Sequence, residues 1–444
     1  MTAFDTLRRK LRGAAVNAYL GTPGQAARSA VAEARRRAAG AARRVDFYHD
    51  VADPGSYLVA QVVERLLRAY PVELGFHLVG PPASDVDPAP ELRVRHAVRD
   101  AADVALHWDV DFPARKGELD TQAVRRAAAV LVRERPAADQ LRIAVELGRA
   151  LWASDGKQLA ALTGAHGAEG LGSVPPTLAA AYNELRTRGH YQAATIGYGG
   201  DWYSGVSRLP YLEARLAREL GVDAPPLLAP RPEAARPPAR LAKEDRVPVD
   251  FWFSFRSPYS YLALAGVADL AARYPIDLRI RPILPLVERG GQLPPVKRLA
   301  IGRDAKREAE RLGIPFGHIC DPLGPGNDNC LAIAKAAIAD GKGLDFLRSA
   351  ALGIWAEARD MASYVDLRAV VERAGLSWTD ARTSLGDPSW KAWAKANADD
   401  LGVAGLWGVP SFRAGDYVTW GQDRLPMLED RLRRHGAAGG PTSR

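Results

Sequence analysis

Cysteine is almost absent from this chain, and long apolar runs are missing altogether. Only Cys320 and Cys330 occur among the 444 residues. Two thiols at this spacing supply no disulfide framework, no four-ligand metal cage and no Cys-x-x-Cys redox motif. No apolar run reaches the roughly 18 residues of a membrane-spanning helix. The sequence therefore predicts no integral membrane segment and, because it also lacks a signal-peptide core, a cytoplasmic location.

Acidic residues are scarce at the start of the chain. Residues 1–44 hold ten Arg and Lys against two acids, Asp5 and Glu33, and this excess equals the net charge of +8 of the whole chain. The remainder is balanced, which argues against a nucleic-acid groove. Apolar residues at helical spacing in 2–20 predict a basic amphipathic segment. Such a segment could dock on its own domain or touch an anionic membrane or an acidic partner, and a transit peptide is a further alternative.

Repetition is the most informative feature of the sequence. The stretch that begins at Val45 recurs 204 residues later at Val249. Farther along, residues 189–216 match residues 405–432 at ten of 28 positions without a gap. The two copies are offset by 204 residues at the start and by 216 near the end, far more than the period of a solenoid repeat. We therefore predict a tandem duplication at the scale of a domain.

A proline-rich stretch separates the two copies. Residues 225–248 contain seven prolines among mixed charges, a composition that resists both helix and sheet. The predicted division is a basic helical segment (1–44), a first copy (45–224), a Pro-rich linker (225–245), a second copy (246–436) and a disordered tail (437–444).

The second copy shows a fixed order of strands and helices. Periodicity and turn residues predict strand 249–255, helix 258–273, strand 277–282, helices 298–312, 329–340, 343–357, 364–374 and 377–400, strands 411–413 and 417–419, and helix 422–434. A β-α-β unit, an all-helical insertion, a hairpin and a closing helix are typical of a thioredoxin-like sheet. The fold class we predict is α/β, with two tandem thioredoxin-like domains that each carry an inserted helical subdomain.

Ser257 and Pro258 form the most suggestive local motif. A hydroxyl at the N-cap followed by proline is a helix start. Free backbone N–H groups and the positive end of the helix dipole favour a bound anion at such a place. The alternative is a well-capped helix with no further role.

Three motifs in the second copy resemble those of one known family. They are Phe-Arg-Ser-Pro-Tyr-Ser-Tyr-Leu at 255–262, Gly-Val-Pro-Ser at 408–411 and Trp-Gly-Gln-Asp-Arg-Leu at 420–425. Together they resemble the 2-hydroxychromene-2-carboxylate isomerase and kappa-class glutathione transferase branch of the DsbA-like thioredoxin fold. The resemblance covers roughly 247–434, and the first copy more faintly.

This resemblance implies glutathione as the cofactor and Ser257 as the catalytic residue. Ser257 would donate a hydrogen bond to the glutathione sulfur and hold it as a thiolate. A thiol with a pKa of about 8.5 needs local positive potential to be a nucleophile at neutral pH, and a helix N-terminus supplies it. Serine cannot form a disulfide, so disulfide oxidoreductase chemistry is not expected.

The resemblance also implies a set of glutathione-binding residues. A cis-proline loop at Val409 and Pro410 would pair with the cysteinyl backbone. The γ-glutamyl end would meet Gln422, Asp423 and Arg424. The alternatives are an ordinary trans-proline turn and a helix start with a solvated arginine.

Two further binding residues precede the helical insertion. Lys297 matches the family's lysine near the glycyl carboxylate, and Gln292 stands where many relatives carry asparagine. The loop 321–329 would shape the electrophile pocket. Relatives often have an arginine near Asn329, so its absence here weakens the case for a chromene substrate, and Cys330 is expected to be an ordinary helix residue.

The first copy departs from this pattern at each chemical position. Asp53 replaces Ser257, and Ala194, Ser207 and Arg93 stand where the second copy has Pro410, Asp423 and Lys297. A carboxylate would repel a thiolate but still cap a helix. We predict a degenerate, largely structural domain, with a new ligand site at Asp53 and Arg93 as the alternative.

The sequence as a whole predicts a glutathione-dependent enzyme. Its substrate would be an electrophilic small molecule, in some cases aromatic, changed by cis–trans isomerisation or by conjugation. A non-catalytic thioredoxin-fold scaffold is the alternative, and a thiol–disulfide oxidoreductase a weaker one. An intramolecular pseudo-dimer and a homodimer both stay open.

Overall fold

The chain divides into two units, each made of segments from different parts of the sequence. The structure, a computed structural model, describes residues 13–113, 119–223, 225–229 and 246–438. The C-terminal unit takes in Met1–Gln25, Ala235–Leu293 and Ile301–Arg444, and the N-terminal unit takes in Ala26–Ala234 and Pro294–Ala300. Most of the predicted linker (230–245) and the end of the predicted tail (439–444) lie outside the described residues.

A four-stranded sheet forms the centre of the C-terminal unit. Its strands are β5 (Val247–Phe253), β6 (Ile276–Pro282), β7 (Ser411–Ala414) and β8 (Tyr417–Trp420), in the order β6-β5-β7-β8. The central strand β5 runs parallel to β6 and antiparallel to β7. Because β5 has neighbours on both sides and helices around it, six of its seven residues are buried.

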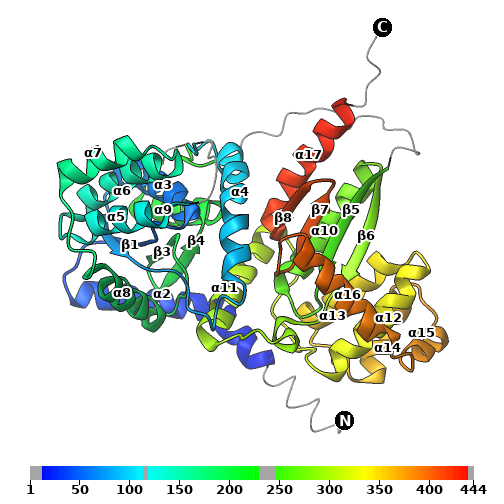
Figure 1. The fold of residues 1–444 in the computed structure, drawn as a ribbon. Coiled ribbons are helices and arrows are strands. Elements are labelled where there is room, and N and C mark those ends of the chain that lie inside the picture. Colours follow the sequence, from blue (N-terminus) through cyan, green and yellow to red (C-terminus); the bar gives the residue numbers. More distant parts are fainter. Residues whose placement is uncertain (1–12, 114–118, 224, 230–245, 439–444) are drawn as a thin grey trace. The chain divides into compact units, whose positions relative to one another are not determined.

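Helices surround this sheet and fill the insertion between β6 and β7. They are α10 (Pro258–Arg273), η3 (Leu286–Arg289), α11 (Pro295–Leu312), α12 (Pro325–Ala339), α13 (Gly343–Ala356), α14 (Tyr364–Arg373), α15 (Trp378–Ser384), α16 (Ser389–Val403), η4 (Gln422–Arg424) and α17 (Leu425–Ala438). Figure 1 shows α12 to α15 gathered beyond one end of the sheet.

Two helix boundaries in the insertion differ from the prediction. The single helix expected over 377–400 is wrong, because α15 stops at Ser384 and α16 starts only at Ser389. Gly386 and Pro388 lie in the break, where both residue types end helices. Helix α12 begins at Pro325, earlier than predicted, because proline suits the first helical position after the turn at Gly324.

The N-terminal unit has a sheet of the same order. Its elements are α2 (Thr22–Ala38), β1 (Arg44–His49), α3 (Pro54–Ala69), β2 (Glu73–Leu78), α4 (Pro90–Trp108), α5 (Thr121–Val132), α6 (Ala137–Trp152), α7 (Gly156–His166), α8 (Val174–Arg188), β3 (Thr195–Tyr198), β4 (Asp201–Ser204), η1 (Val206–Arg208) and α9 (Leu209–Leu220). The strand order is β2-β1-β3-β4, with β1 parallel to β2 and antiparallel to β3. The predicted fold class is confirmed, whereas the duplication itself stays a prediction that the shared order supports.

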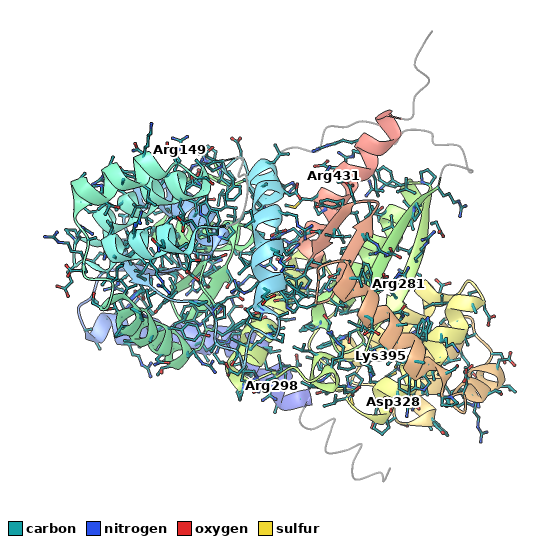
Figure 2. All side chains as sticks on the ribbon, in the orientation of Figure 1. Arg149, Arg281, Arg298, Asp328, Lys395 and Arg431 are labelled. Atoms are coloured by element: carbon teal, nitrogen blue, oxygen red, sulfur yellow. The ribbon has the colours of Figure 1, made fainter. Side chains whose placement is uncertain are left out.

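A buried aspartate pairs with cations across the central strand in the C-terminal unit. Asp250 accepts from Arg281 of β6 at 2.5 Å and from Arg413 of β7 at 2.7 Å. Figure 2 labels Arg281. The Asp250 carboxylate therefore links three strands at once. Its two charge-assisted hydrogen bonds offset the desolvation of a residue that is 3% exposed.

The central strand of the N-terminal unit carries the same device. Asp46 of β1 lies 2.9 Å from His77 of β2 and 2.6 Å from Arg188 of α8. Burial raises the pKa of Asp46, but the hydrogen bonds with His77 and Arg188 outweigh burial and lower the pKa to about 2. No helix within the described residues is long and apolar enough to cross a membrane.

Candidate active site

Ser257 caps α10 at the end of the central strand. Its backbone is extended (φ −102°, ψ 116°), and its hydroxyl oxygen accepts from the Ser260 N–H at 3.2 Å. The tight turn before it is closed by a hydrogen bond of 3.0 Å from the Ser257 N–H to the Ser254 carbonyl. The N-cap and N1 proline predicted from the sequence are confirmed. The hydroxyl is thereby fixed at the positive end of a 16-residue helix.

The loop before β7 comes to this hydroxyl from the far side of the insertion. The Val409–Pro410 peptide bond is cis, as predicted, and the Ser257 hydroxyl donates to the Val409 carbonyl at 3.2 Å. The Gly421 N–H bonds the Pro410 carbonyl at 2.9 Å, which holds the loop to the end of β8. Among the described residues, the Val409 N–H has no hydrogen-bond partner. One edge of this loop therefore offers both a donor and an acceptor close to Ser257.

An aromatic pair adjoins the cis-proline loop. The rings of Trp407 and Trp420 lie 4.7 Å apart, and Trp420 is 37% exposed. A Cβ on Gly408 would stand 2.6 Å from the Trp420 indole nitrogen, so only glycine permits this close approach. Sequence reasoning used Trp420 as part of a motif and did not assign either tryptophan to the site. The signal was the two tryptophans flanking the Val-Pro motif.

The residues expected to hold the γ-glutamyl end form the short helix η4. Gln422 is buried, and its amide nitrogen lies 3.4 Å from a carboxylate oxygen of Glu308. Asp423 and Arg424 form an ion pair of 2.8 Å, with side chains 18% and 15% exposed. Helix η4 packs against α10, the helix that Ser257 caps. The C-terminal unit therefore gathers Ser257, the cis-proline loop and this ion pair around one helix.

Lys297 and Gln292 are placed differently. Gln292 is exposed in the segment between η3 and α11. Lys297 belongs to the stretch of α11 that groups with the N-terminal unit, where its ammonium donates to the Val86 carbonyl at 2.6 Å and lies 5.7 Å from the Tyr191 ring centroid. Burial lowers the pKa of Lys297, and Asp87 and Asp85 oppose that effect. Glutathione binding by these two residues stays a prediction.

The loop entering α12 carries charge close to Ser257 in sequence and space. Arg256, the residue before Ser257, makes a bidentate ion pair with Asp321 at 2.8 and 2.9 Å. Asn327 in the first turn of α12 is fully buried, and neither polar atom of its side chain has a partner among the described residues. Asp328, which follows it, is labelled in Figure 2. The predicted loop 321–329 is helical from Pro325 onward, and its role in shaping an electrophile pocket stays a prediction.

Neither cysteine offers a nucleophile. Neither Cys320 nor Cys330 forms a disulfide, and both are buried. Burial raises the pKa of the Cys330 thiol well above its ordinary value. Cys330 is a residue of α12, as expected. Within the described ranges, no group of three or more His, Cys, Asp or Glu side chains could hold a metal ion.

The N-terminal unit places a carboxylate where the C-terminal unit has the serine hydroxyl. Asp53 caps α3 and accepts from the N–H groups of Gly55 at 3.2 Å and Ser56 at 3.1 Å. The prediction that aspartate still serves as the cap is confirmed. Arg93 is engaged by Asp87 at 2.6 Å. Burial and the charge of Asp53 raise the pKa of neighbouring Asp50 to about 7. A thiolate bound here would lie beside these two carboxyl groups, and a negative charge on them would disfavour it.

Comparison with known proteins agrees with this geometry. Residues 248–433 match the family model of the DSBA-like thioredoxin domain. The C-terminal half carries a DsbA-like thioredoxin domain. Among curated proteins, the chain is similar to 2-hydroxychromene-2-carboxylate isomerase of Sphingobium xenophagum, with 27% identity over 192 residues, 41% of this chain and 97% of the relative. It is also similar to the enzyme of the same name from Pseudomonas putida, with 29% identity over 203 residues, 42% of this chain and 94% of the relative.

A solved structure of 2-hydroxychromene-2-carboxylate isomerase is similar as well. It has 25% sequence identity and a TM-score of 0.38, and the match covers 44% of this chain and all of the other. The resemblance of the DsbA-like domain to this isomerase, predicted from three motifs, is confirmed. The duplication, the use of glutathione and transferase activity stay predictions.

Proposed function

We propose that the DsbA-like domain is a glutathione-dependent enzyme acting on an electrophilic small molecule. One observation carries the proposal: the Ser257 hydroxyl stands at the N-terminus of α10, 3.2 Å from the carbonyl of Val409 in the cis-proline loop. A redox thiol at this position would exchange disulfides. A hydroxyl cannot exchange disulfides, but it can donate and accept hydrogen bonds.

The residues around Ser257 fit the functional groups of glutathione. The Val409 N–H and carbonyl can form a short strand-like pairing with a peptide backbone. Asp423 suits an amino group, and Arg424 suits a carboxylate. Both side chains remain partly exposed within their ion pair of 2.8 Å, so a ligand can reach them. The site thus offers complementary partners for a small peptide with a free amino end.

Ser257 would stabilise a thiolate. When bound, glutathione supplies the sulfur nucleophile for an electrophilic carbon. The Ser257 hydrogen, which now points to the Val409 carbonyl, would turn toward that sulfur, while the oxygen keeps the Ser260 N–H. The helix dipole and this hydrogen bond both favour the ionised form, which lowers the thiol pKa below about 8.5.

Isomerisation is the outcome that the comparisons favour. The relatives named above are isomerases by name, which supports a reaction that releases its substrate rearranged and glutathione unchanged. Conjugation would leave glutathione attached to the product. The exposed Trp420 beside the loop offers an aromatic surface on which a planar substrate could stack.

Calorimetric titration of reduced glutathione tests the proposal. In calorimetry we expect saturable binding of glutathione to the native chain. In ultraviolet absorbance, measured on the same complexes, we expect a clearly weaker thiolate band for Ser257→Ala than for the native chain. Ser377→Ala is the matched control, because Ser377 caps α15 in the same unit and accepts from the Asp380 N–H at 3.4 Å. Absence of binding at millimolar glutathione would sink the proposal. Thiolate absorbance that survives in Ser257→Ala would remove Ser257 from this role.

A further inference from the structure

A hollow in the C-terminal unit lies along α10 and begins at Tyr261, about one helical turn after Ser257. It measures about 520 Å³ and is bounded by α10, α13 and the ends of α11 and α14. Ser257, Val409 and the η4 residues do not line it. Its volume falls within the roughly 300–1,000 Å³ of small-molecule sites. The cavity is therefore large enough for a ligand of its own.

The walls of this cavity are mostly apolar. Leu264 and Ala265 of α10 face Leu352 of α13, and Ile314 follows the end of α11. The hydroxyl of Tyr261, another lining residue, is occupied by a hydrogen bond of 2.8 Å to the Pro315 carbonyl. The Tyr261 hydroxyl therefore already has a partner within the protein. An occupant would gain contact with aliphatic and aromatic carbon along most of its length.

Two arginines reach the cavity, and they differ in what they already bind. Arg373 is committed to the protein: it donates to the Ser349 hydroxyl at 2.8 Å, to the Ser349 carbonyl at 2.7 Å and to Glu357 at 2.6 Å. Arg348 is exposed, and among the described residues no carboxylate or other acceptor bonds it. One guanidinium is thus structural, and the other is available to a ligand.

The net charge of the lining narrows the class of ligand. The charged lining residues are Arg348, Arg373 and Asp345. Asp345 is exposed and lies 3.9 Å from the Lys342 ammonium, outside the lining set. One positive charge remains unmatched, carried by Arg348. A planar guanidinium binds carboxylates and sulfonates through two parallel hydrogen bonds.

We propose that this cavity binds a small monoanion with an apolar body, whose carboxylate or sulfonate pairs with Arg348. The lining contains none of Ser257, Val409 and the η4 residues, so the proposed ligand is a different molecule from glutathione. The cavity would be a binding site for a fatty or aromatic acid, and the proposal does not depend on which reaction takes place at Ser257.

The probe for this test is 8-anilinonaphthalene-1-sulfonate, an aromatic monoanion whose fluorescence rises in apolar surroundings. Titration of the native chain should show one saturable site. Arg348→Glu should weaken the affinity at least tenfold, and Arg348→Lys, which keeps the charge but loses the second parallel hydrogen bond, should weaken it by less. The matched control is Arg382→Glu, since Arg382 is likewise an exposed helical arginine without a partner among the described residues. It should leave the affinity unchanged.

Two further measurements separate this cavity from other surfaces. Ala265→Trp, at an exposed lining position, should place an indole ring in the hollow and weaken binding of the probe. The neutral analogue N-phenyl-1-naphthylamine should bind native and Arg348→Glu chains equally. Binding that withstands both Arg348→Glu and Ala265→Trp, equal weakening by Arg382→Glu, or no binding to the native chain would each overturn the proposal. Ser257→Ala should not affect the probe.

Discussion

Replacing Ser257 in two ways separates its structural from its chemical role. Ser257→Ala removes the oxygen that accepts from Ser260 and the hydrogen that Val409 receives, both at 3.2 Å. Loss of an N-cap costs about 0.5–2 kcal/mol, and loss of one neutral hydrogen bond costs about 0.5–1.5 kcal/mol. We expect the free energy of unfolding of the C-terminal unit to fall by about 1–3 kcal/mol.

Ser257→Asp is the informative partner of that variant. The N-terminal unit shows that aspartate caps the corresponding helix, since Asp53 accepts from the N–H groups of Gly55 and Ser56. A carboxylate at 257 should therefore keep the cap and lose only the donated hydrogen bond to Val409. We expect a smaller loss of about 1 kcal/mol. Glutathione should nevertheless lose its thiolate, because a nearby negative charge raises the pKa of the thiol.

Urea unfolding and ultraviolet absorbance measure the two effects separately. Urea gives the free energy of unfolding, and the absorbance of the glutathione complex at pH 7 gives the thiolate fraction. The reasoning predicts that stability ranks native, Asp, Ala while only the native chain shows thiolate. If Ser257→Asp proves less stable than Ser257→Ala, the capping account is wrong. If it retains thiolate, the electrostatic account is wrong.

Three further perturbations follow from contacts described above. Gly408→Ala should cost about 1–3 kcal/mol and alter tryptophan fluorescence, because the added Cβ would stand 2.6 Å from the Trp420 indole; a silent variant would contradict that contact. Asp250→Asn should cost about 2–3 kcal/mol in urea unfolding, because two cations lose their shared carboxylate, whereas Asp277→Asn, at a half-exposed side chain, should cost under about 0.5 kcal/mol. Asp50 has its pKa raised from 3.8 to about 7, so the folded chain holds a proton that the unfolded chain releases and stability falls as pH rises from 4 to 7. Asp50→Asn should therefore gain stability relative to native by at most about 4 kcal/mol between pH 4 and pH 8, and a pH-independent difference would refute the raised pKa.

Local signals in the sequence predicted a large part of this fold. Helix α10 was expected over 258–273 and spans those residues, because Ser-Pro starts it and Tyr-Pro follows its end. Asp53 was expected to cap α3 and does. In both cases a few neighbouring residues decide the outcome, so no distant contact is needed to foresee it.

Other features depended on distant contacts and could not be foreseen in this way. The placement of Lys297 beside the Val86 carbonyl joins positions 211 residues apart. The approach of Trp407 to Trp420 needs the hairpin of β7 and β8 to form first. The break between α15 and α16 is a different failure. Gly386 and Pro388 are local signals that end a helix, but the helical periodicity of the residues on either side led to the prediction of one continuous helix.

The position of β5 in its sheet has a consequence for how the protein is made. Strand β6 follows it closely in sequence, but β7, its other neighbour, is reached only after the whole helical insertion. During synthesis at about 5–20 residues per second, one edge of this apolar strand stays unpaired for on the order of ten seconds. The unpaired N–H and C=O groups of an open strand edge can form hydrogen bonds with strands of other chains and so cause aggregation. Nascent chains that stop before Ser411 should therefore be the form most dependent on chaperones.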